Sequence, residues 1–356
     1  MAINLAEKYS DKVAERFAKS SVTAGAYNDE IKFDGVKTVS VYSVDTAPLN
    51  DYIPHSIYRY GEPAELGDSI QTFTLSQDKC FTYSIDKGVD NDQMNVKGAA
   101  KTLKREIDEV ISPYLDKYRL AAWAHNAGQF GEIATINKST VVEYITEATA
   151  ALDNALVPED GRTLFITADN YRALKQNPDF IACDRLGEKA LGKGVVGEID
   201  GMKVVKCPEG WLPDGAELLI THKSAVIAPT KLRDYKIHSD PPGINGNLVE
   251  GRIIHDAFVL GSRANGVYVG LNSAYAVETP VITDIIANSA VSLSCNTASA
   301  DIYYTEDGSD PRYSTTAKAY TGGEISYVFW SSSNMLTACA KMEDGYSSAL
   351  AMFTLE

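Results

Sequence analysis

The chain has 356 residues, of which 44% are hydrophobic and 23% are charged, and its formal net charge at pH 7 is −15. This length is enough for two domains with sizeable cores, and the composition argues against wholesale disorder. A strongly acidic chain repels a phosphate backbone, so the charge disfavours general nucleic-acid binding.

The N-terminal stretch predicts an amphipathic helix and not a targeting segment. Leu5, Tyr9, Val13 and Phe17 recur at intervals of four, with charged residues between them. The stretch lacks the apolar core of a secretory signal peptide, and no run of the chain approaches the roughly 20 apolar residues that a bilayer requires. Five cysteines without a CxxC pair fit a reducing compartment. We therefore expect a protein that is made in a cytoplasm and has no membrane contact.

Two stretches of alternating apolar residues then flank a long polar and aromatic excursion. The first contains Val39, Val41 and Val44, and the second contains Phe73 to Ile85. The excursion between them, residues 50–70, is rich in Pro, Gly, Tyr and charge. Compact domains seldom need so long a connection unless it makes contacts elsewhere. The pattern predicts an extended two-stranded arm over residues 36–90.

A long helix is predicted next, over residues 95–126. Its apolar residues follow the helical period of 3.6 and comprise Val96, Ala100, Leu103, Ile107, Val110, Tyr114, Tyr118 and Ala121. Pro113 interrupts this helix because it lacks a backbone donor and clashes with the carbonyl four residues back. Two alternatives remain open: the helix kinks at Pro113, or Ser112 caps a second helix that has Pro113 at its first position.

Shorter elements follow and favour a mixed α+β body without regular β-α-β alternation. Thr140 and Glu143 match a capping box at the start of a second helix. The run "RTLFITA" predicts a short buried strand, and Asp169 is the expected cap of a short helix after it. After residue 280 the chain shows only short strand-like runs separated by turn residues, which predicts a small β-sandwich. Cys295 and Cys339 lie on two of these strands, and we expect them to remain buried thiols.

The acidic stretch "IYYTEDGSDP", residues 302–311, predicts a strand that enters a turn. Asp307-Gly308 is typical of a tight turn in which Gly supplies a positive φ. An EF-hand is excluded because Gly308 comes too early in the loop. We expect a structural corner, with a weak surface calcium site as the minor alternative.

Other candidate sites for chemistry are weak. "GEKALGKG", residues 187–194, approaches a P-loop but has Gly194 where the motif requires Ser or Thr. The five histidines form no HxxxH or HExxH pair, so no zinc site is predicted. His238-Ser239-Asp240 is interpreted as a solvated turn. We expect no enzyme activity, no cofactor and no metal.

Three stretches resemble the major capsid proteins of tailed bacteriophages with the Hong Kong 97-type fold. They are "GVKTVSVYSVDTAPLNDY" followed by the long arm, "AAKTLKREIDEVISPYLDKYRLAAWA", and "GVVGEIDGMKVVKCPEGWLPDGAELLI" followed by "HKSAVIAP". The resemblance covers residues 1–275. It implies an N-terminal arm at 1–30, an extended loop at 36–90, a spine helix of the peripheral domain at 95–126, an axial domain at 139–230, and return strands of the peripheral domain at 231–271.

The same resemblance implies a structural role in a virion that is assembled in the host cytoplasm. Its partners would be further copies in pentamers and hexamers, a separate scaffolding protein, a portal, and double-stranded DNA enclosed without sequence-specific binding. Some relatives form a covalent bond between a loop Lys and a neighbour's Asn, but this loop tip contains no Lys and the nearest is Lys79. We expect non-covalent contacts between subunits instead, through Tyr52, Tyr58, Arg59 and Tyr60.

Residues 281–356 have a second resemblance, carried by "ADIYYTEDGSDP". This motif is similar to the strand and turn of the immunoglobulin-like module found at the C-terminus of chitobiases, where it is an appendage and not catalytic. The resemblance implies an exposed decoration. Its aromatic residues are candidates for host or mucus glycan contacts, although core packing is the commoner fate of such rings; they are Tyr313, Tyr320, Tyr327 and Trp330. The alternative function is a carbohydrate-binding adhesion protein that works through this module.

Overall fold

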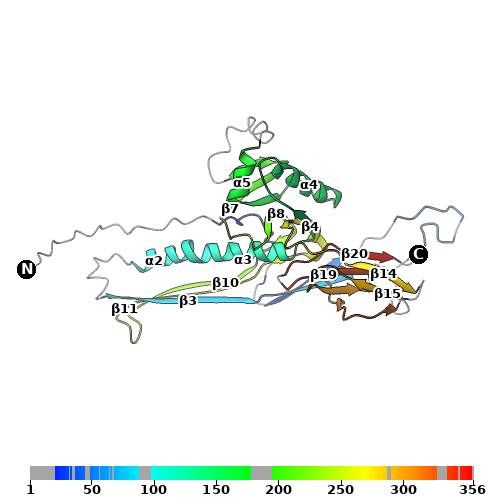
Figure 1. The fold of residues 1–356 in the computed structure, drawn as a ribbon. Helices are drawn as coiled ribbons and strands as arrows, with labels where there is room; N and C mark the ends of the chain where they lie inside the picture. The colour runs from blue at the N-terminus through cyan, green and yellow to red at the C-terminus, as the bar shows by residue number, and fades with distance from the viewer. Residues whose placement is uncertain are drawn as a thin grey trace, which may run out of the picture.

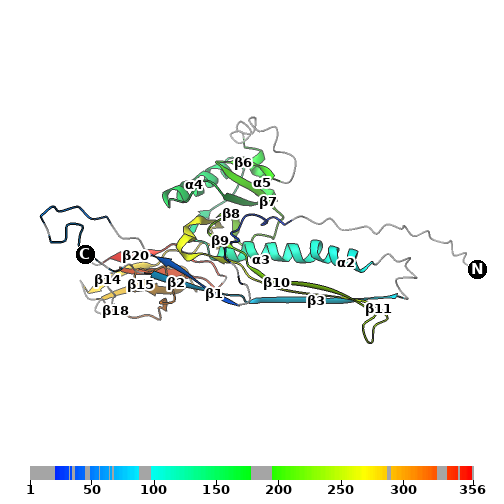
Figure 2. The same cartoon turned by 180° about the vertical axis from the view of Figure 1, so that it is seen from behind.

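The computed structural model describes residues 21–31, 33, 37–44, 49–55, 57–63, 65, 68–87, 98–177, 195–286, 290–326, 335–343 and 345–354. A long helix lies over a three-stranded ribbon, and a lobe built on a six-stranded sheet stands beside the end of that helix (Figure 1). A two-stranded arm and a β-sandwich occupy the opposite end from the tip of the ribbon (Figure 2). The predicted N-terminal helix, the "GEKALGKG" loop, Tyr327 and Trp330 lie outside the described residues.

The long helix is one continuous rod made of α2 (Ala99–Glu106), η1 (Ile107–Ile111) and α3 (Ser112–His125). η1 is a π-helical turn that ends two residues before Pro113. The wider π turn accommodates a residue that cannot donate to the carbonyl four residues back. Ser112 has helical dihedrals, φ −61° and ψ −47°, so the alternative in which it caps a separate helix is wrong.

The π turn also shifts the buried face of the helix. Val110, which the helical period placed in the apolar stripe, is 52% exposed, whereas Ile111 and Leu115 are buried. A π turn adds a residue to one turn of the helix, so the residues after it are rotated relative to a regular 3.6-residue pattern. The buried residues of α3 are Leu115, Asp116, Arg119, Leu120, Trp123 and Ala124.

The three-stranded ribbon lies under this helix. It is antiparallel, in the order β10 (Thr230–Ser239), β11 (Gly246–His255), β3 (Gln77–Asp86). Ile111 and Leu115 of the helix pack against Ile253 of β11. At the end of β10, His238 pairs with Glu250 at 3.3 Å and Asp240 pairs with Lys87. All three residues of His238-Ser239-Asp240 are exposed, but His238 and Ser239 are the last residues of β10 and only Asp240 enters the turn, so the expectation of a solvated turn is correct for Asp240 alone.

The arm is the antiparallel pair β1 (Thr38–Val44) and β2 (Asp68–Thr74). Its inner face packs Val39, Val41 and Phe73 into a small core with Ile254 and Leu260. The expected arm over residues 36–90 was too long, because β3 leaves it and pairs with β11. Alternation marks both β2 and β3 as strands, but it carries no information about the partner of either.

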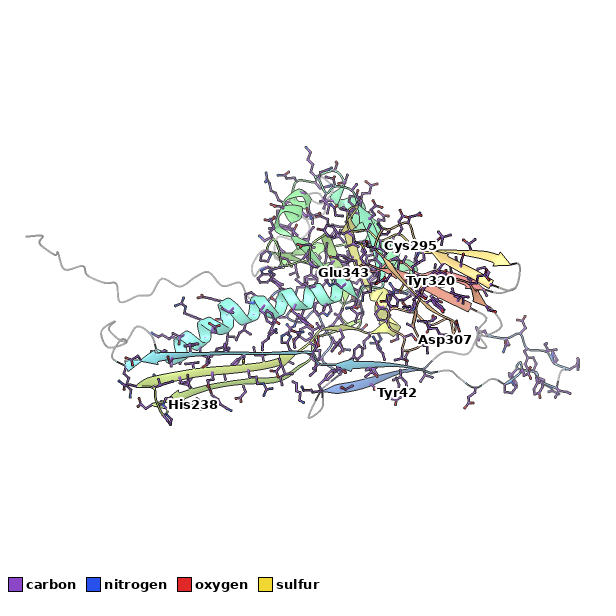
Figure 3. The ribbon with its side chains drawn as sticks, turned by 60° about the horizontal axis from the view of Figure 1, so that its bottom comes forward. Tyr42, His238, Cys295, Asp307, Tyr320 and Glu343 are labelled. Atoms are coloured by element: carbon purple, nitrogen blue, oxygen red, sulfur yellow. The ribbon has the colours of Figure 1, made fainter. Side chains whose placement is uncertain are left out.

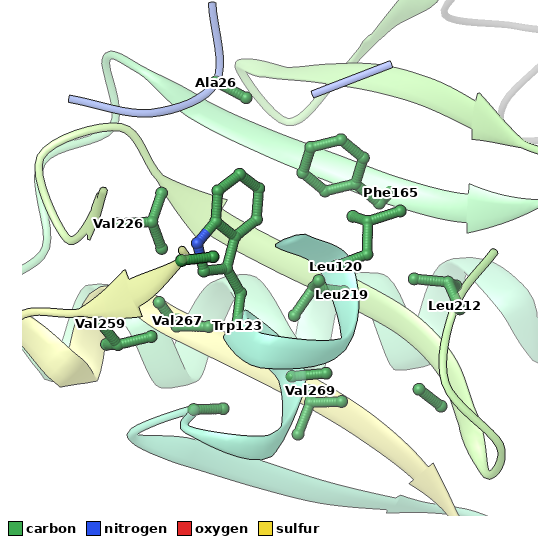
Figure 4. Packing of buried hydrophobic residues seen from close by; sticks show 14 of the residues in the cluster. Ala26, Leu120, Trp123, Phe165, Leu212, Leu219, Val226, Val259, Val267 and Val269 are labelled. Carbon is green, nitrogen blue, oxygen red and sulfur yellow. The ribbon is translucent and has the colours of Figure 1, made fainter. Parts of the chain in front are cut away.

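The six-stranded sheet is mixed and has the order β4 (Gln129–Ile133), β13 (Val267–Asn272), β8 (Ala216–His222), β5 (Arg162–Thr167), β7 (Met202–Cys207), β6 (Val195–Ile199). Its central strand β5 is buried on both faces, as "RTLFITA" predicted. Leu164 and Ile166 pack under α4 (Val141–Asn154). On the other face of the sheet, Phe165 packs toward Trp123 of α3 (Figure 4). β13 belongs to this sheet, where it lies between β4 and β8, although its residues 267–271 fall in the range 231–271 that was expected to return to the peripheral domain.

Both predicted helix caps are corrected. Thr140 stands at the N-cap of α4, but its hydroxyl donates to the Thr135 carbonyl (2.9 Å) and makes no capping bond. The Asn137 side chain accepts from the Thr140 backbone N–H instead (3.2 Å). In α5 (Ala168–Lys175) the cap is Thr167, whose hydroxyl accepts from the backbone N–H of Asn170, and not Asp169.

The C-terminal part is the predicted β-sandwich. One sheet contains β14 (Val281–Ile286), β15 (Ala290–Ser294) and β18 (Ile325–Ser326), and the other contains β17 (Lys318–Ala319), β16 (Asp301–Thr305), β19 (Met335–Lys341) and β20 (Ala351–Thr354). Buried residues of both sheets share one core: Val291, Leu293, Ile325, Leu336 and Ala338. Two short pieces complete the body: the pair β9 (Val226–Ile227) and β12 (Phe258–Val259), and the 3-10 helix η2 (Gly261–Gly266). None of the helices in the described part of the chain is long and apolar enough to cross a membrane.

Candidate assembly surfaces

The tip of the arm, residues 49–63, exposes several large apolar side chains. It is ordered locally, because the Ile53 backbone N–H donates to the Arg59 carbonyl (3.0 Å) and the Gly61 backbone N–H to the Tyr58 carbonyl (3.2 Å). Its exposed residues are Leu49, Tyr52, Ile53, Ile57, Tyr58 and Tyr60, with exposed fractions from 52% at Tyr52 to 102% at Leu49. Singly exposed apolar residues need no explanation, whereas a contiguous group indicates a contact surface.

Four predicted contact residues lie together in this tip. The rings of Tyr52 and Tyr60 meet edge to face with centroids 5.2 Å apart. Tyr58 and Arg59 occupy the turn between them and are also exposed. The structure therefore places the predicted residues in one exposed cluster, while their role as contacts between subunits stays a prediction.

The outer face of the arm is polar near its base and apolar toward its tip. Near the base, hydroxyls pair across the strands, Thr38 with Thr74 at 3.0 Å and Ser40 with Thr72 at 3.1 Å. Toward the tip the same face carries Tyr42, Val44 and Ile70, which are 65%, 65% and 43% exposed. Tyr42 lies on the arm away from the body in Figure 3. The sequence analysis missed this apolar part of the outer face. The pattern that could have revealed it is the spacing of Tyr42 and Val44, which alternate out of phase with Val39 and Val41.

The arm is fixed to the body by polar contacts at the middle of β2 and just after its end. The Gln71 side chain donates to the Val259 carbonyl (3.2 Å) and accepts from the Gly261 backbone N–H (2.6 Å). Five residues further on, after the end of β2, the Ser76 backbone N–H donates to the Asp256 carboxylate (2.7 Å). The arm therefore leaves the body from a defined point and presents its apolar outer half away from it.

A second fixed point is the strap formed by residues 21–28. The carboxylate of Asp116, fully buried on α3, accepts from the Ser21 hydroxyl (2.7 Å), the Val22 backbone N–H (2.8 Å) and the Thr23 hydroxyl (2.6 Å). Arg119 donates to the Thr23 hydroxyl as well (2.9 Å). Sequence reasoning missed Asp116, because a carboxylate within an amphipathic helix is ordinarily assigned to the solvated face.

The acidic corner after β16 is structural, as expected. Gly308 has φ +76°, and Asp307 accepts from the Ser309 backbone N–H (3.0 Å) and the Thr316 hydroxyl (2.7 Å). Burial opposes ionisation of Asp307, but the hydrogen bonds from Ser309 and Thr316 outweigh it and keep its pKa below the usual value. Among the described residues, no group of three or more His, Cys, Asp or Glu could hold a metal ion.

Two predicted glycan contacts lie in packing interactions. The Tyr313 hydroxyl donates to the Asn126 carbonyl (2.7 Å) at the end of α3. The Tyr320 ring packs against the sandwich core and meets Tyr304 with centroids 6.3 Å apart, while its hydroxyl donates to the Gly323 carbonyl (2.6 Å). A glycan-binding face stays a prediction, and these two positions give it no support.

The two sandwich cysteines are free thiols, as expected. Cys339 is buried, and burial raises its pKa to about 12. Cys295 is only partly buried and donates to the Glu278 carbonyl (3.3 Å), so the expectation of two buried thiols is correct for one of them.

Comparisons with known proteins find one family model and a set of solved phage structures. Residues 285–351 match the family model of the Chitobiase/beta-hexosaminidase C-terminal domain. Solved phage structures match 76% of the chain. One is from Mycobacterium phage Che8, with a TM-score of 0.61, 20% identity and 98% of that chain covered. The capsid structure of the Cyanophage P-SCSP1u has a TM-score of 0.63, 16% identity and 93% coverage.

A third is the mature capsid of bacteriophage PhiM1, with a TM-score of 0.58, 9% identity, and 76% of this chain and 92% of that chain covered. No curated protein matches the sequence. At these identities the likeness is one of fold. The expectation of a phage capsid fold followed by an immunoglobulin-like module is confirmed.

Proposed function

We propose that the chain is the major capsid subunit of a tailed bacteriophage, and that many copies form an icosahedral shell around double-stranded DNA. The observation that carries this proposal is the arm: its outer half and its tip are apolar, exposed and directed away from the body. The capsid fold of the similar structures supports the same role. The role is structural and not enzymatic.

The mechanism is the burial of the arm against a neighbouring copy. Covering apolar surface gains about 25 cal/mol per Å². Because the arm tip and the surface it would cover are different parts of the subunit, the contact is heterologous. Heterologous contacts close into rings when the rotation per copy fits, which is how pentamers and hexamers would form.

The remaining partners follow from this role. The net charge of −15 leaves no excess of cations to grip the phosphate backbone of packaged DNA. The proposed shell encloses the genome without sequence-specific binding. A separate scaffolding protein and a portal would complete assembly in the host cytoplasm. The alternative, a carbohydrate-binding adhesion protein, gains no support from Tyr313 and Tyr320, which serve packing.

The test is electron microscopy of the full-length protein co-expressed with the scaffolding protein of the same genome. The wild type should give shells, tubes or capsomer rings. The arm-tip variant Tyr58→Ser/Tyr60→Ser should give dispersed particles, because two exposed rings of the tip are lost. Met352→Thr, at a 63% exposed apolar residue of the sandwich, is the matched control and should assemble.

Dispersed particles from the wild type would overturn the proposal. Normal shells from the arm-tip variant would remove the arm from the mechanism and would leave the capsid role to other surfaces.

A further inference from the structure

The β-sandwich meets the body through two short loops, which we call the docking loops: residues 310–313 and residues 345–346. Both loops contain groups that are buried against the body. An appended module on a flexible linker would not bury such groups, because interfaces between loosely joined domains are small and polar.

The first docking loop is centred on Arg312, whose side chain is 6% exposed. Its guanidinium makes a forked ion pair with Asp310, at 2.6 Å for the shortest contact. It also donates to the carbonyls of Ala127 and Gly128, at 3.3 and 3.1 Å. These carbonyls follow the last turn of α3, where the helix dipole is negative and favours a cation. A planar guanidinium with five donors can serve the carboxylate and both carbonyls at once.

Tyr313, next in the same loop, reaches the point where the sandwich, the body and the arm base meet. This point is Gly261: a β-carbon there would lie 2.8 Å from Cβ of Tyr313 and 3.1 Å from the side-chain oxygen of Gln71. Gln71 is the residue of β2 that fixes the arm to the body. Tyr313 therefore packs beside the contact between Gln71 and Gly261 that holds the arm to the body.

The second docking loop inserts Tyr346 into the core of the body. Tyr346 is 1% exposed and belongs to the same buried cluster as Trp123 and Leu212. Its hydroxyl donates to the Asp214 carbonyl (2.8 Å), and its ring meets His125 of α3 edge to face with centroids 4.8 Å apart. One residue before it, Gly345 has φ +97°, a conformation that suits glycine and brings the loop against His125.

We propose that the sandwich is an internal brace, which uses the docking loops to fix the end of the long helix, the base of the arm and the loop around Asp214 in one arrangement. The partner of this surface is the chain's own body. The expected role of the sandwich was an exposed decoration, and this proposal adds a structural role within the subunit. The proposal concerns the single subunit and does not depend on shell formation.

Amide hydrogen exchange on the unassembled full-length chain tests the brace, because exchange reports local opening at each segment. The variants are Arg312→Ala, Arg312→Lys and Tyr346→Phe, the last of which removes only a hydroxyl. We expect Arg312→Ala to increase exchange by on the order of tenfold in residues 118–128 and 68–76. Arg312→Lys and Tyr346→Phe should show smaller increases in the same segments. The matched control Lys318→Ala breaks a 2.9 Å ion pair with Glu306 inside the sandwich and should leave both segments unchanged.

Two outcomes would overturn the proposal. In one, the Arg312 variants loosen the sandwich strands while residues 118–128 and 68–76 exchange as in the wild type, which would make the sandwich a tethered module. In the other, Lys318→Ala raises exchange in these segments as much as Arg312→Ala does. If Arg312→Ala does not fold, the milder Tyr346→Phe and Arg312→Lys decide the question. Assembly is not measured, so neither outcome bears on the proposed capsid role.

Discussion

At the residue scale, the body depends on a small number of buried polar groups with several partners each. Asp116 accepts three hydrogen bonds from the strap. Asp256 accepts from the Ser76 and Ala257 backbone N–H groups and from the Tyr118 hydroxyl (2.6 Å). Buried polar groups that lose a partner are costly, so these carboxylates decide how firmly the surrounding segments attach.

Replacing Asp116 tests the strap. Asp116→Ala leaves the donors of residues 21–23 without their acceptor and removes the carboxylate that lies 3.9 Å from the buried Arg119 guanidinium. We expect a loss of about 3 kcal/mol in the free energy of unfolding. The control Lys117→Ala, at an exposed position on the same helix, should stay within about 0.5 kcal/mol of the wild type. Urea denaturation measures both. Equal stabilities for the two variants would contradict the role assigned to Asp116.

Tyr118 links stability to alkaline pH. Burial, followed by the hydrogen bond to Asp256, raises its pKa from 10.0 to about 12. The folded state therefore favours the neutral phenol, and this contribution is complete below pH 10 and is lost as the pH rises toward 12. Tyr118→Phe should be less stable at neutral pH and should lose stability less steeply between pH 10 and pH 12. Denaturant titrations across this range give the slope, and an unchanged slope would refute the assignment.

At the scale of the elements, the position of one turn decides which face of a helix is buried. The π turn at Ile107–Ile111 accommodates Pro113 and rotates α3 relative to α2, so that Val110 is exposed and Ile111 is buried. The backbone conformation likewise decides which residue caps α5. Both Thr167 and Asp169 have a side chain that can cap a helix, and the extended backbone at Thr167, φ −66° and ψ 159°, makes Thr167 the cap.

The two possible caps of α5 are separable by mutation. Thr167→Ala removes the acceptor for the Asn170 backbone N–H and should cost about 1 kcal/mol of folding free energy. Asp169→Ala removes only an exposed charge in the first turn and should cost about 0.5 kcal/mol or less. Thermal unfolding of the two variants ranks them. A larger loss for Asp169→Ala would restore the cap inferred from the sequence.

Gly251 sets the packing of the ribbon. It lies in the central strand β11, and a β-carbon there would come within 2.1 Å of the Phe81 ring and 2.9 Å of the Tyr235 ring. Gly251→Ala should therefore force both rings to move and should cost about 1–3 kcal/mol. Gly98→Ala is the control, since no atom lies closer than 4.0 Å to its added β-carbon. Chemical denaturation of both proteins measures the difference, and equal stabilities would argue against close packing at Gly251.

At the scale of the whole molecule, the net charge opposes association of copies, whereas the arm would favour it in the proposed shell. Each subunit carries a net charge of −15, so copies repel one another over the distance that salt leaves unscreened. The apolar outer half of the arm acts only at contact. Assembly should therefore become stronger as the ionic strength rises, whereas an interface held by ion pairs would become weaker.

Raising the salt concentration should promote assembly of the proposed shell. Between about 0.01 M and about 0.15 M the Debye length falls from about 30 Å to about 8 Å, which weakens repulsion between subunits more than it weakens apolar contacts. Light scattering during assembly should show a lower critical concentration at the higher salt. A higher critical concentration would indicate that attractive ion pairs dominate the interface.

The sequence by itself determined which segments form strands and where the turn of the sandwich lies. Alternation identified β1, β2 and β3, the composition of "RTLFITA" identified a strand buried on both faces, and Asp307-Gly308 identified the corner of the sandwich. These features depend on neighbouring residues, whose periodicity and turn chemistry are visible in one dimension. The clustering of Tyr52, Tyr58, Arg59 and Tyr60 was accessible for the same reason.

Only the tertiary structure decided which elements pair and which polar groups are shared between distant segments. β3 pairs with β11, Asp116 binds the strap, and Arg312 joins the sandwich to the end of α3. In these cases the partners lie roughly 90 to 190 residues apart in the chain. Their selection depends on where the whole fold brings donors, acceptors and apolar faces together. The sandwich is for that reason recognisable from its own residues, whereas its attachment to the body is not.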